Sequence, residues 1–123
     1  MIVEDYVSFE TAKLLKEKGF DEPCIWAYDP YAVSFSKNYC EPKNSELNEY
    51  EYSKPTLQRV MKWLREVHHI FIDVDWNDNY YFILITDMIT KDYVKETNLP
   101  SEEFSTYEEA CESAIKYCLE NLI

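Results

Sequence analysis

The sequence contains a single glycine, Gly19, among 123 residues. Phosphate-binding loops and dinucleotide-binding fingerprints need several glycines, because the backbone must approach the phosphates closely. Nucleotide binding through a glycine-rich loop is therefore excluded. Since Gly19 follows a predicted helix, we expect it to adopt the left-handed conformation, with Phe20 folding back toward Leu15.

Basic side chains are also scarce. Lys and Arg number 12 against 24 Asp and Glu, which gives a formal net charge of −12. Direct nucleic-acid binding depends largely on Lys and Arg that neutralise phosphates, so we do not expect it here. The excess of carboxylates favours solubility and permits a basic protein partner.

Long hydrophobic runs are absent as well. The longest, residues 80–85, is far shorter than the roughly 20 residues that span a bilayer, and the first residues are acidic where a signal peptide would be basic. We therefore expect no membrane segment and a cytoplasmic location. In that reducing compartment the four cysteines would not be expected to form disulfides.

What the sequence does contain is enough apolar material for a core. Hydrophobic residues make up 46% of the chain and aromatic residues 16%, with 11 tyrosines. A chain of this length and composition typically folds as one unit. We predict a single domain over residues 1–123, without a cofactor.

Apolar side chains at helical spacing predict three helices, over residues 8–18, from about residue 55 to 67, and over residues 107–122. The capping residue Ser8 supports the first helix. Two overlapping capping boxes, Ser105 with Glu108 and Thr106 with Glu109, support the last. The second helix is predicted most strongly, because five residues form one core-facing stripe. These are Leu57, Val60, Met61, Leu64 and Val67.

Turn signals between apolar segments predict two hairpins, with strands over residues 24–28 and 33–39, then over residues 70–76 and 80–87. Residues 41–53 are polar and acidic, which is typical of a surface loop. The order helix, hairpin, helix, hairpin, helix predicts an α+β fold of two layers. One antiparallel sheet of about four strands would pack against the three helices.

The second hairpin offers a candidate partner surface. A three-residue turn at residues 77–79 would pair Trp76 with Tyr80 on an inner face. The outer face would then be an apolar patch, of the kind that marks an interface or a homodimer contact unless helices of the same chain cover it. This patch consists of Phe71, Tyr81, Ile83 and Ile85.

A second candidate surface is basic. Arg59, Lys62 and Arg65 are spaced to share one side of the second helix. Guanidinium groups bind carboxylates and phosphates with two aligned donors, so this side could bind an anion. The alternative is a solvated helix face whose charges pair with Glu66 and the acidic loop.

The remaining patterns argue against metal sites. Asp73, Asp75, Asn77 and Asn79 have the spacing of a calcium loop, but Asp78 occupies the glycine position and Leu84 the position of the bidentate Glu. This segment is therefore interpreted as a solvated strand face and turn.

The adjacent side chains of His68 and His69 would point in different directions on a helix. Two histidines that bind zinc from one helix are instead spaced at positions i and i+4, which share a face. His68, near a helix C-terminus, is better explained as a cation stabilised by the helix dipole.

The cysteines offer one weak catalytic hypothesis. Cys111 and Cys118 lie on the apolar stripe of the last helix and are predicted to be core residues. Cys40 is the thiol expected to be exposed. A Cys-His enzyme would need it to lie beside a base in an accessible pocket.

Four segments resemble a family of short uncharacterised proteins encoded by phages and integrated mobile elements of gut bacteria. They are residues 8–15, 55–58, 62–68 and 107–110, and the likeness extends over the first helix and both later helices. The resemblance implies a mobile-element setting in the bacterial cytoplasm. It implies no activity and no site residues.

The sequence therefore favours a non-enzymatic accessory protein that binds another protein. One alternative is an acidic mimic that occupies the basic groove of a nucleic-acid-binding protein, since the chain carries 24 carboxylates. A small Cys-His or metal-dependent hydrolase is the third hypothesis.

Overall fold

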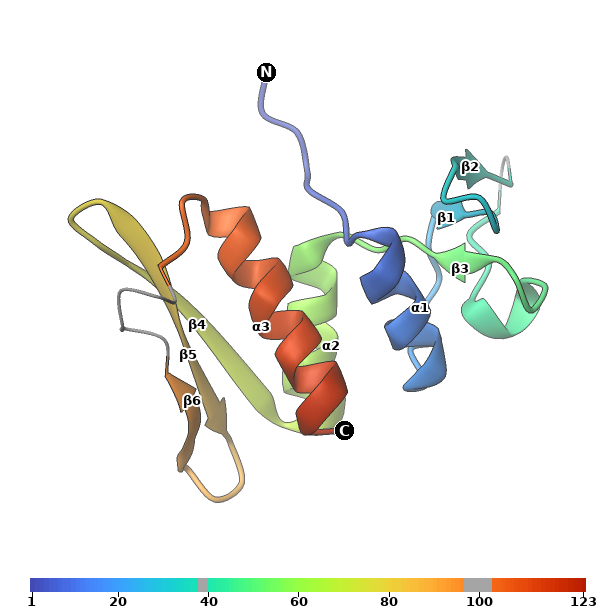
Figure 1. Ribbon diagram of the computed structural model, residues 1–123. Helices are drawn as coiled ribbons and strands as arrows, with labels where there is room; N and C mark the ends of the chain where they lie inside the picture. Colours follow the sequence, from blue (N-terminus) through green and yellow to red (C-terminus); the bar gives the residue numbers. More distant parts are fainter. Residues whose placement is uncertain (38–39, 97–102) are drawn as a thin grey trace. The chain divides into compact units, whose positions relative to one another are not determined.

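A computed structural model describes residues 1–37, 40–96 and 103–123. These residues form three α-helices and two three-stranded antiparallel sheets (Figure 1). The predicted α+β class with its order of helices and hairpins is thus confirmed. The structure differs from the prediction in having two sheets, because each hairpin acquires a third strand of its own. The described residues form two compact units, residues 1–56 with 119–123 and residues 57–118.

The first unit begins with helix α1 (Phe9–Glu17). Ser8 caps it as predicted, since its Oγ accepts a hydrogen bond from the backbone N–H of Thr11 at 3.2 Å. The sheet has the order β2-β1-β3, formed by β1 (Trp26–Tyr28), β2 (Ser34–Ser36) and β3 (Tyr52–Ser53). The observed strands are shorter than predicted, and positions 38–39 of the predicted return strand lie outside the described residues.

The end of α1 follows the sequence prediction. Gly19 has a φ of 88°, and the N–H of Phe20 donates to the carbonyl of Leu15 at 2.9 Å. Phe20 is fully buried as a result. The closure satisfies a terminal carbonyl and carries an aromatic ring into the core.

Gly19→Ala is expected to lower the free energy of unfolding by about 1 kcal/mol, because a left-handed conformation is costly for a residue with a Cβ. Nothing lies within 4 Å of where that Cβ would be, so the cost is conformational rather than steric. Urea denaturation measures it. Gly19→Asn is the control, since Asn tolerates this conformation and should cost less. Equal losses for the two variants would show that the conformation is not the cause.

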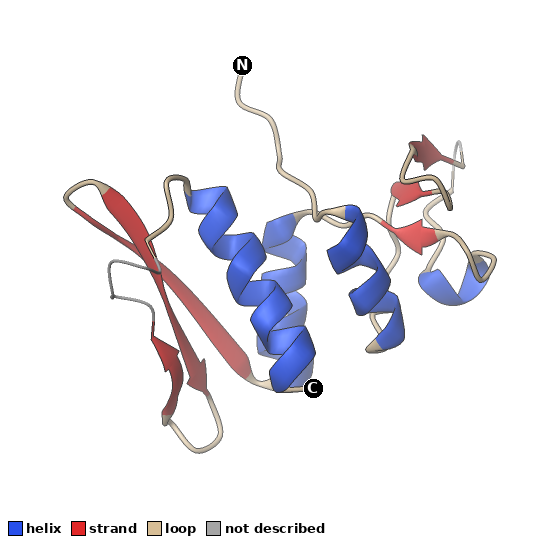
Figure 2. Ribbon diagram, in the orientation of Figure 1, coloured by secondary structure: helices blue, strands red, loops and turns tan. Residues whose placement is uncertain are grey.

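The second unit is a sheet backed by two helices. Its strands are β4 (Ile70–Asn77), β5 (Tyr80–Asp87) and β6 (Tyr93–Glu96), in the order β4-β5-β6. Helices α2 (Leu57–His68) and α3 (Tyr107–Asn121) lie along one face of this sheet (Figures 1 and 2). The last residues of α3 belong to the first unit.

The apolar stripe of α2 is largely confirmed. Leu57, Val60, Met61 and Leu64 are buried, and so is Trp63 beside them. The prediction was wrong for one position, Val67, whose side chain is 52% exposed. Val67 lies in the last turn of α2, where the chain leaves the helix at His69 (φ 57°) and turns into β4.

The turn between β4 and β5 differs from the prediction by one residue. It has two residues, Asp78 and Asn79, because Asn77 pairs directly with Tyr80. Asp78 takes the left-handed conformation (φ 57°) that tight hairpin turns require. A shift of one residue exchanges the two faces of a strand, so every predicted partner on β5 moves to the other side of the sheet.

The predicted partner surface of Phe71, Tyr81, Ile83 and Ile85 is therefore wrong. Ile83 and Ile85 pair with Val74 and Ile72 on the helix-facing side and are only 1% and 0% exposed.

Tyr81 lies on that same helix-facing side, with its ring edge-on to Tyr107 of α3 at 6.1 Å between centroids. Phe71 belongs to the opposite face. A homodimer through these four residues would have to unfold the core first.

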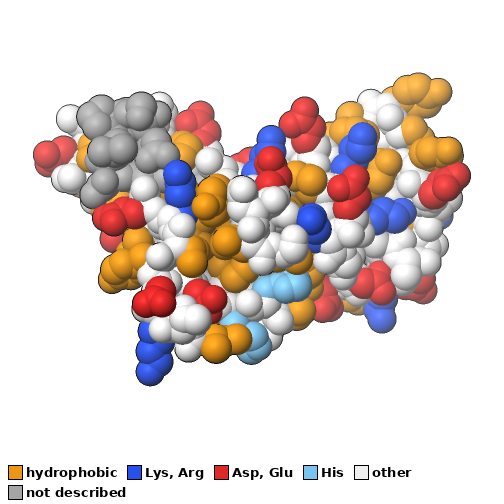
Figure 3. Space-filling view, turned by 60° about the horizontal axis from the view of Figure 1, so that its bottom comes forward, with side chains coloured by type: hydrophobic (Ala, Val, Ile, Leu, Met, Phe, Trp, Pro, Cys, Tyr) orange, Lys and Arg blue, Asp and Glu red, His pale blue; other side chains and the backbone are white. Residues whose placement is uncertain are grey.

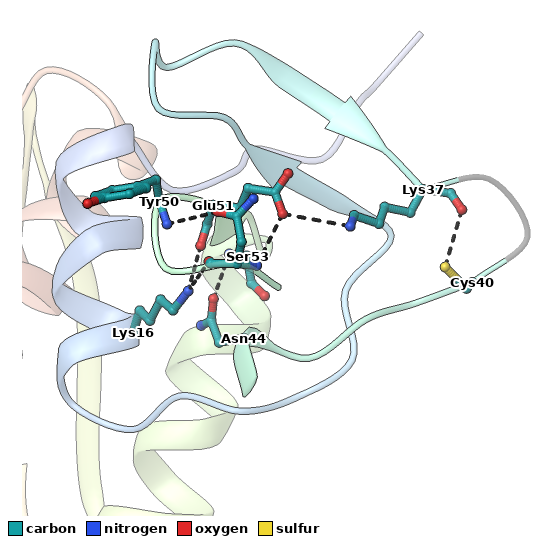
Figure 4. A network of polar contacts seen from close by, with 8 residues as sticks. Lys16, Lys37, Cys40, Asn44, Tyr50, Glu51 and Ser53 are labelled. Atoms are coloured by element: carbon teal, nitrogen blue, oxygen red, sulfur yellow. Dashed lines mark hydrogen bonds and ion pairs between the residues drawn. The ribbon is translucent and has the colours of Figure 1, made fainter. Parts of the chain in front are cut away.

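Residues 41–53 are more ordered than a surface loop. They contain a short 3-10 helix, η1 (Asn44–Glu46), and the strand β3. Asn44 is buried and bridges two parts of the first unit, since its Nδ2 donates to the carbonyl of Phe20 at 2.8 Å. Its Oδ1 accepts a hydrogen bond from the N–H of Ser53, also at 2.8 Å (Figure 4). Leu47 and Ser53 are buried as well. The surface-loop prediction is thus wrong for these positions.

Lys16 also ties α1 to this segment (Figure 4). Its Nζ donates to the carbonyls of Asn48 and Glu51 at 2.7 and 2.8 Å. Partial burial lowers the pKa of Lys16, although Glu51 and Glu49 oppose that shift. The ammonium group thus replaces water as the partner of two loop carbonyls and holds the loop against the helix.

Candidate functional site

The cysteines of the last helix serve packing. Cys111 and Cys118 are fully buried, and burial raises the pKa of their thiols to about 11 and about 12. Both thiols are thus protonated at neutral pH and poor nucleophiles. Cys24 is buried too, whereas Cys40 is exposed as predicted, with its Sγ donating to the carbonyl of Lys37 at 3.2 Å (Figure 4). The first unit, which contains Cys40, has no histidine in its sequence.

A thiol-reactive dye should therefore modify Cys40 rapidly at pH 8. Cys111 and Cys118 should react at least about 100-fold more slowly, since their raised pKa values leave little thiolate. The measurement is the stopped-flow time course of the native protein. In Cys40→Ser the fast phase should vanish, and a fast phase that persists would show that one of the buried thiols is reactive.

The two histidines have structural roles. The ring of His68 packs edge-on against Trp63, with 4.6 Å between centroids. Partial burial is the larger of two causes that lower the pKa of His68, and the charge of the neighbouring His69 is the smaller. The imidazole of His68 is therefore neutral at pH 7. The prediction that His68 is a cation at the C-terminus of the helix is therefore wrong. Both histidine side chains lie at the surface (Figure 3). Among the described residues, no group of three His, Cys, Asp or Glu side chains could hold a metal ion.

The basic side of α2 stays a prediction. Arg59 and Lys62 are exposed and Arg65 is half-buried, as their spacing on the helix indicates. Arg59 also has an interaction within the chain. The three groups therefore lie on the surface of α2 without a structural feature that indicates a ligand.

The second unit has a sheet face opposite its helices, which we call the outer sheet face. Strand register places six large or acidic side chains on it. Phe71 is 40% exposed and Asp75 is exposed, while the other four are half-buried. The outer sheet face thus consists of Phe71, Asp73 and Asp75 of β4 and Tyr80, Phe82 and Leu84 of β5.

Two carboxylates shape the electrostatics of this face. Asp73 and Asp75 lie two residues apart on one strand and therefore point to the same side. Partial burial, and then the charge of Asp75, raises the pKa of Asp73. Within the described part of the chain, neither carboxylate forms an ion pair with a basic side chain. The face thus combines aromatic rings with uncompensated negative charge.

Sequence reasoning found the residues of β4 on this face but assigned the wrong residues of β5. The pair Asp78-Asn79 is the signal that could have corrected it, because two-residue turns are the commonest hairpin connection.

No protein-family model, curated protein or solved structure matches this chain. Among the described residues, no helix has both the length and the apolar character needed to cross a membrane.

Proposed function

We propose that this chain is a non-enzymatic accessory protein that binds another protein through the outer sheet face. The observation that carries the proposal is the composition of that face. Phe71, Phe82 and Leu84 offer apolar contact area, and Asp73 and Asp75 offer charge. Aromatic anchors flanked by polar groups are typical of protein interfaces.

The charge favours a partner that is different from this chain. Two copies would each bring a formal charge of −12, and a symmetric contact would place their carboxylates close together. A basic partner would instead gain from the same charge. The resemblance to mobile-element proteins supports the bacterial cytoplasm as the setting of this interaction.

The thiols and imidazoles support binding over hydrolysis. Burial raises the pKa values of Cys111 and Cys118, which makes these two thiols poor nucleophiles. His68 packs against Trp63 instead of orienting toward a nucleophile. These groups therefore contribute to packing in this proposal.

Photo-crosslinking followed by titration tests the proposed function. A benzophenone amino acid placed at position 82, in place of Phe82, should crosslink to a bacterial protein. The control places the same amino acid at Ile89, a turn residue that is 72% exposed, and should not crosslink to that protein. The captured protein is then purified and titrated against the intact chain. Leu84→Lys should weaken binding at least about tenfold, and Ile89→Lys should change it less than twofold. Equal affinities for both variants, or no crosslink specific to Phe82, would reject the outer sheet face as the interface.

A further inference from the structure

Strand β4 has an edge with no partner among the described residues, because the sheet order is β4-β5-β6. The direction of its backbone groups follows from Tyr81, whose N–H and C=O both bond to Phe104 at 2.8 and 3.0 Å. These bonds lie on the side of β5 that faces away from β4. Trp76, which pairs with Tyr81, therefore directs its own backbone groups away from β5.

The same alternation applies along the whole strand. Ile70, Ile72 and Val74 also direct their N–H and C=O groups to the open edge, while Asp73 and Asp75 bond to β5. Ile70 and Ile72 are buried, at 7% and 4% exposure, whereas Val74 is half-buried and Trp76 is 60% exposed, so the accessible donors and acceptors of this edge lie at Val74 and Trp76. Unpaired backbone groups of this kind are a template for another strand.

We propose that the partner adds an extended segment to the open edge of β4, with Lys or Arg at alternating positions that face Asp73 and Asp75. This inference rests on the proposed function and specifies its partner. The backbone of the added segment would bond to Val74 and Trp76. Its basic side chains would lie on the outer sheet face.

The negative charges of Asp73 and Asp75 favour a basic segment as the added strand. Asp73 and Asp75 are two residues apart, so side chains at every second position of an added strand lie opposite them on the same face. Cationic side chains there relieve the repulsion between the two carboxylates. A second copy of β4 would instead bring its own carboxylates to this face, and like charges in cross-strand positions are destabilising.

Titration of the full chain with a dye-labelled synthetic peptide tests the inference. The probe is a short peptide in which Lys alternates with Thr, measured by fluorescence anisotropy at about 0.1 M salt, where distant charges are screened. Two control peptides have the same net charge. One sorts the residues into a Lys block and a Thr block, and the other is N-methylated so that it cannot donate backbone hydrogen bonds. We expect the alternating peptide to bind at least about tenfold more tightly than either control.

A charge-matched pair of variants adds the second readout. The double substitution Asp73→Asn with Asp75→Asn should weaken binding of the alternating peptide about tenfold. The control Glu66→Gln with Asp92→Asn removes the same charge from the same unit and should change binding less than about twofold.

Three outcomes overturn the inference. Equal binding of all three peptides indicates general charge attraction, and equal binding of the N-methylated peptide indicates docking without strand addition. Equal losses in both double variants would show that Asp73 and Asp75 have no specific role. If the crosslinked partner binds while the alternating peptide does not, the proposed function stands and strand addition fails. Failure of both experiments rejects both.

Discussion

Ile85→Asp is expected to unfold the second unit, lowering the free energy of unfolding by more than about 4 kcal/mol. The Ile85 side chain is 0% exposed and lies on the helix-facing side of β5, opposite Ile72. An aspartate there would be buried without a cation or a donor, which is among the most costly of single substitutions. Urea denaturation followed by circular dichroism measures the loss.

Leu84→Asp is the matched control, since it introduces the same group one position away on the same strand. Leu84 lies half-buried on the outer sheet face, so its aspartate keeps contact with water. We expect a loss of about 1 kcal/mol. A larger loss for Leu84→Asp than for Ile85→Asp would mean that the two faces of β5 are exchanged.

Asn44→Ala is expected to cost about 3 kcal/mol in the first unit. The amide side chain is 4% exposed and satisfies both the carbonyl of Phe20 and the N–H of Ser53. Its removal leaves two backbone groups without these partners, and an unsatisfied buried group costs about 1 to 3 kcal/mol. Thermal or urea unfolding gives the value.

Ser45→Ala tests whether burial is the cause. Ser45 is the next residue in η1, and its Oγ donates to the carboxylate of Asp21 at 2.9 Å on the surface. An exposed hydrogen bond of this kind exchanges readily with water, so the expected loss is below about 0.5 kcal/mol. Similar losses at positions 44 and 45 would show that Asn44 does not bridge Phe20 and Ser53.

The helices could be predicted from the sequence because their signals are local. Ser8 and Gly19 mark the two ends of α1, and the apolar stripe of α2 recurs along the helix at a regular spacing. The buried positions of Cys111 and Cys118 follow from the same helical spacing on α3.

The register of β4 and β5 could not be predicted in the same way. Every position from residue 80 to 85 is apolar or aromatic, so the alternation that normally distinguishes the two faces is missing on β5. Only the turn length fixes the register, and both Asn77 and Asp78 suit a turn. Strand β6 (Tyr93–Glu96) was not predicted, because it is short and mostly exposed and therefore has no clear apolar alternation.

Long-range contacts account for the other differences. The buried side chain of Asn44 forms hydrogen bonds with the carbonyl of Phe20 and the N–H of Ser53. Neither partner can be identified from the residues that flank Asn44 in the sequence. The pKa of His68 is lowered first by partial burial, where its ring packs against Trp63, and the local sequence pattern does not show this contact.

Residue-resolved amide hydrogen exchange tests the central claim that β4 accepts a basic strand. With the alternating Lys peptide bound, the amides of Val74 and Trp76 should exchange more slowly, since their N–H groups gain partners. The amides of Asp73 and Asp75 should change little, because they already bond to β5. Unchanged exchange at Val74 and Trp76 in the saturated complex would contradict strand addition at this edge.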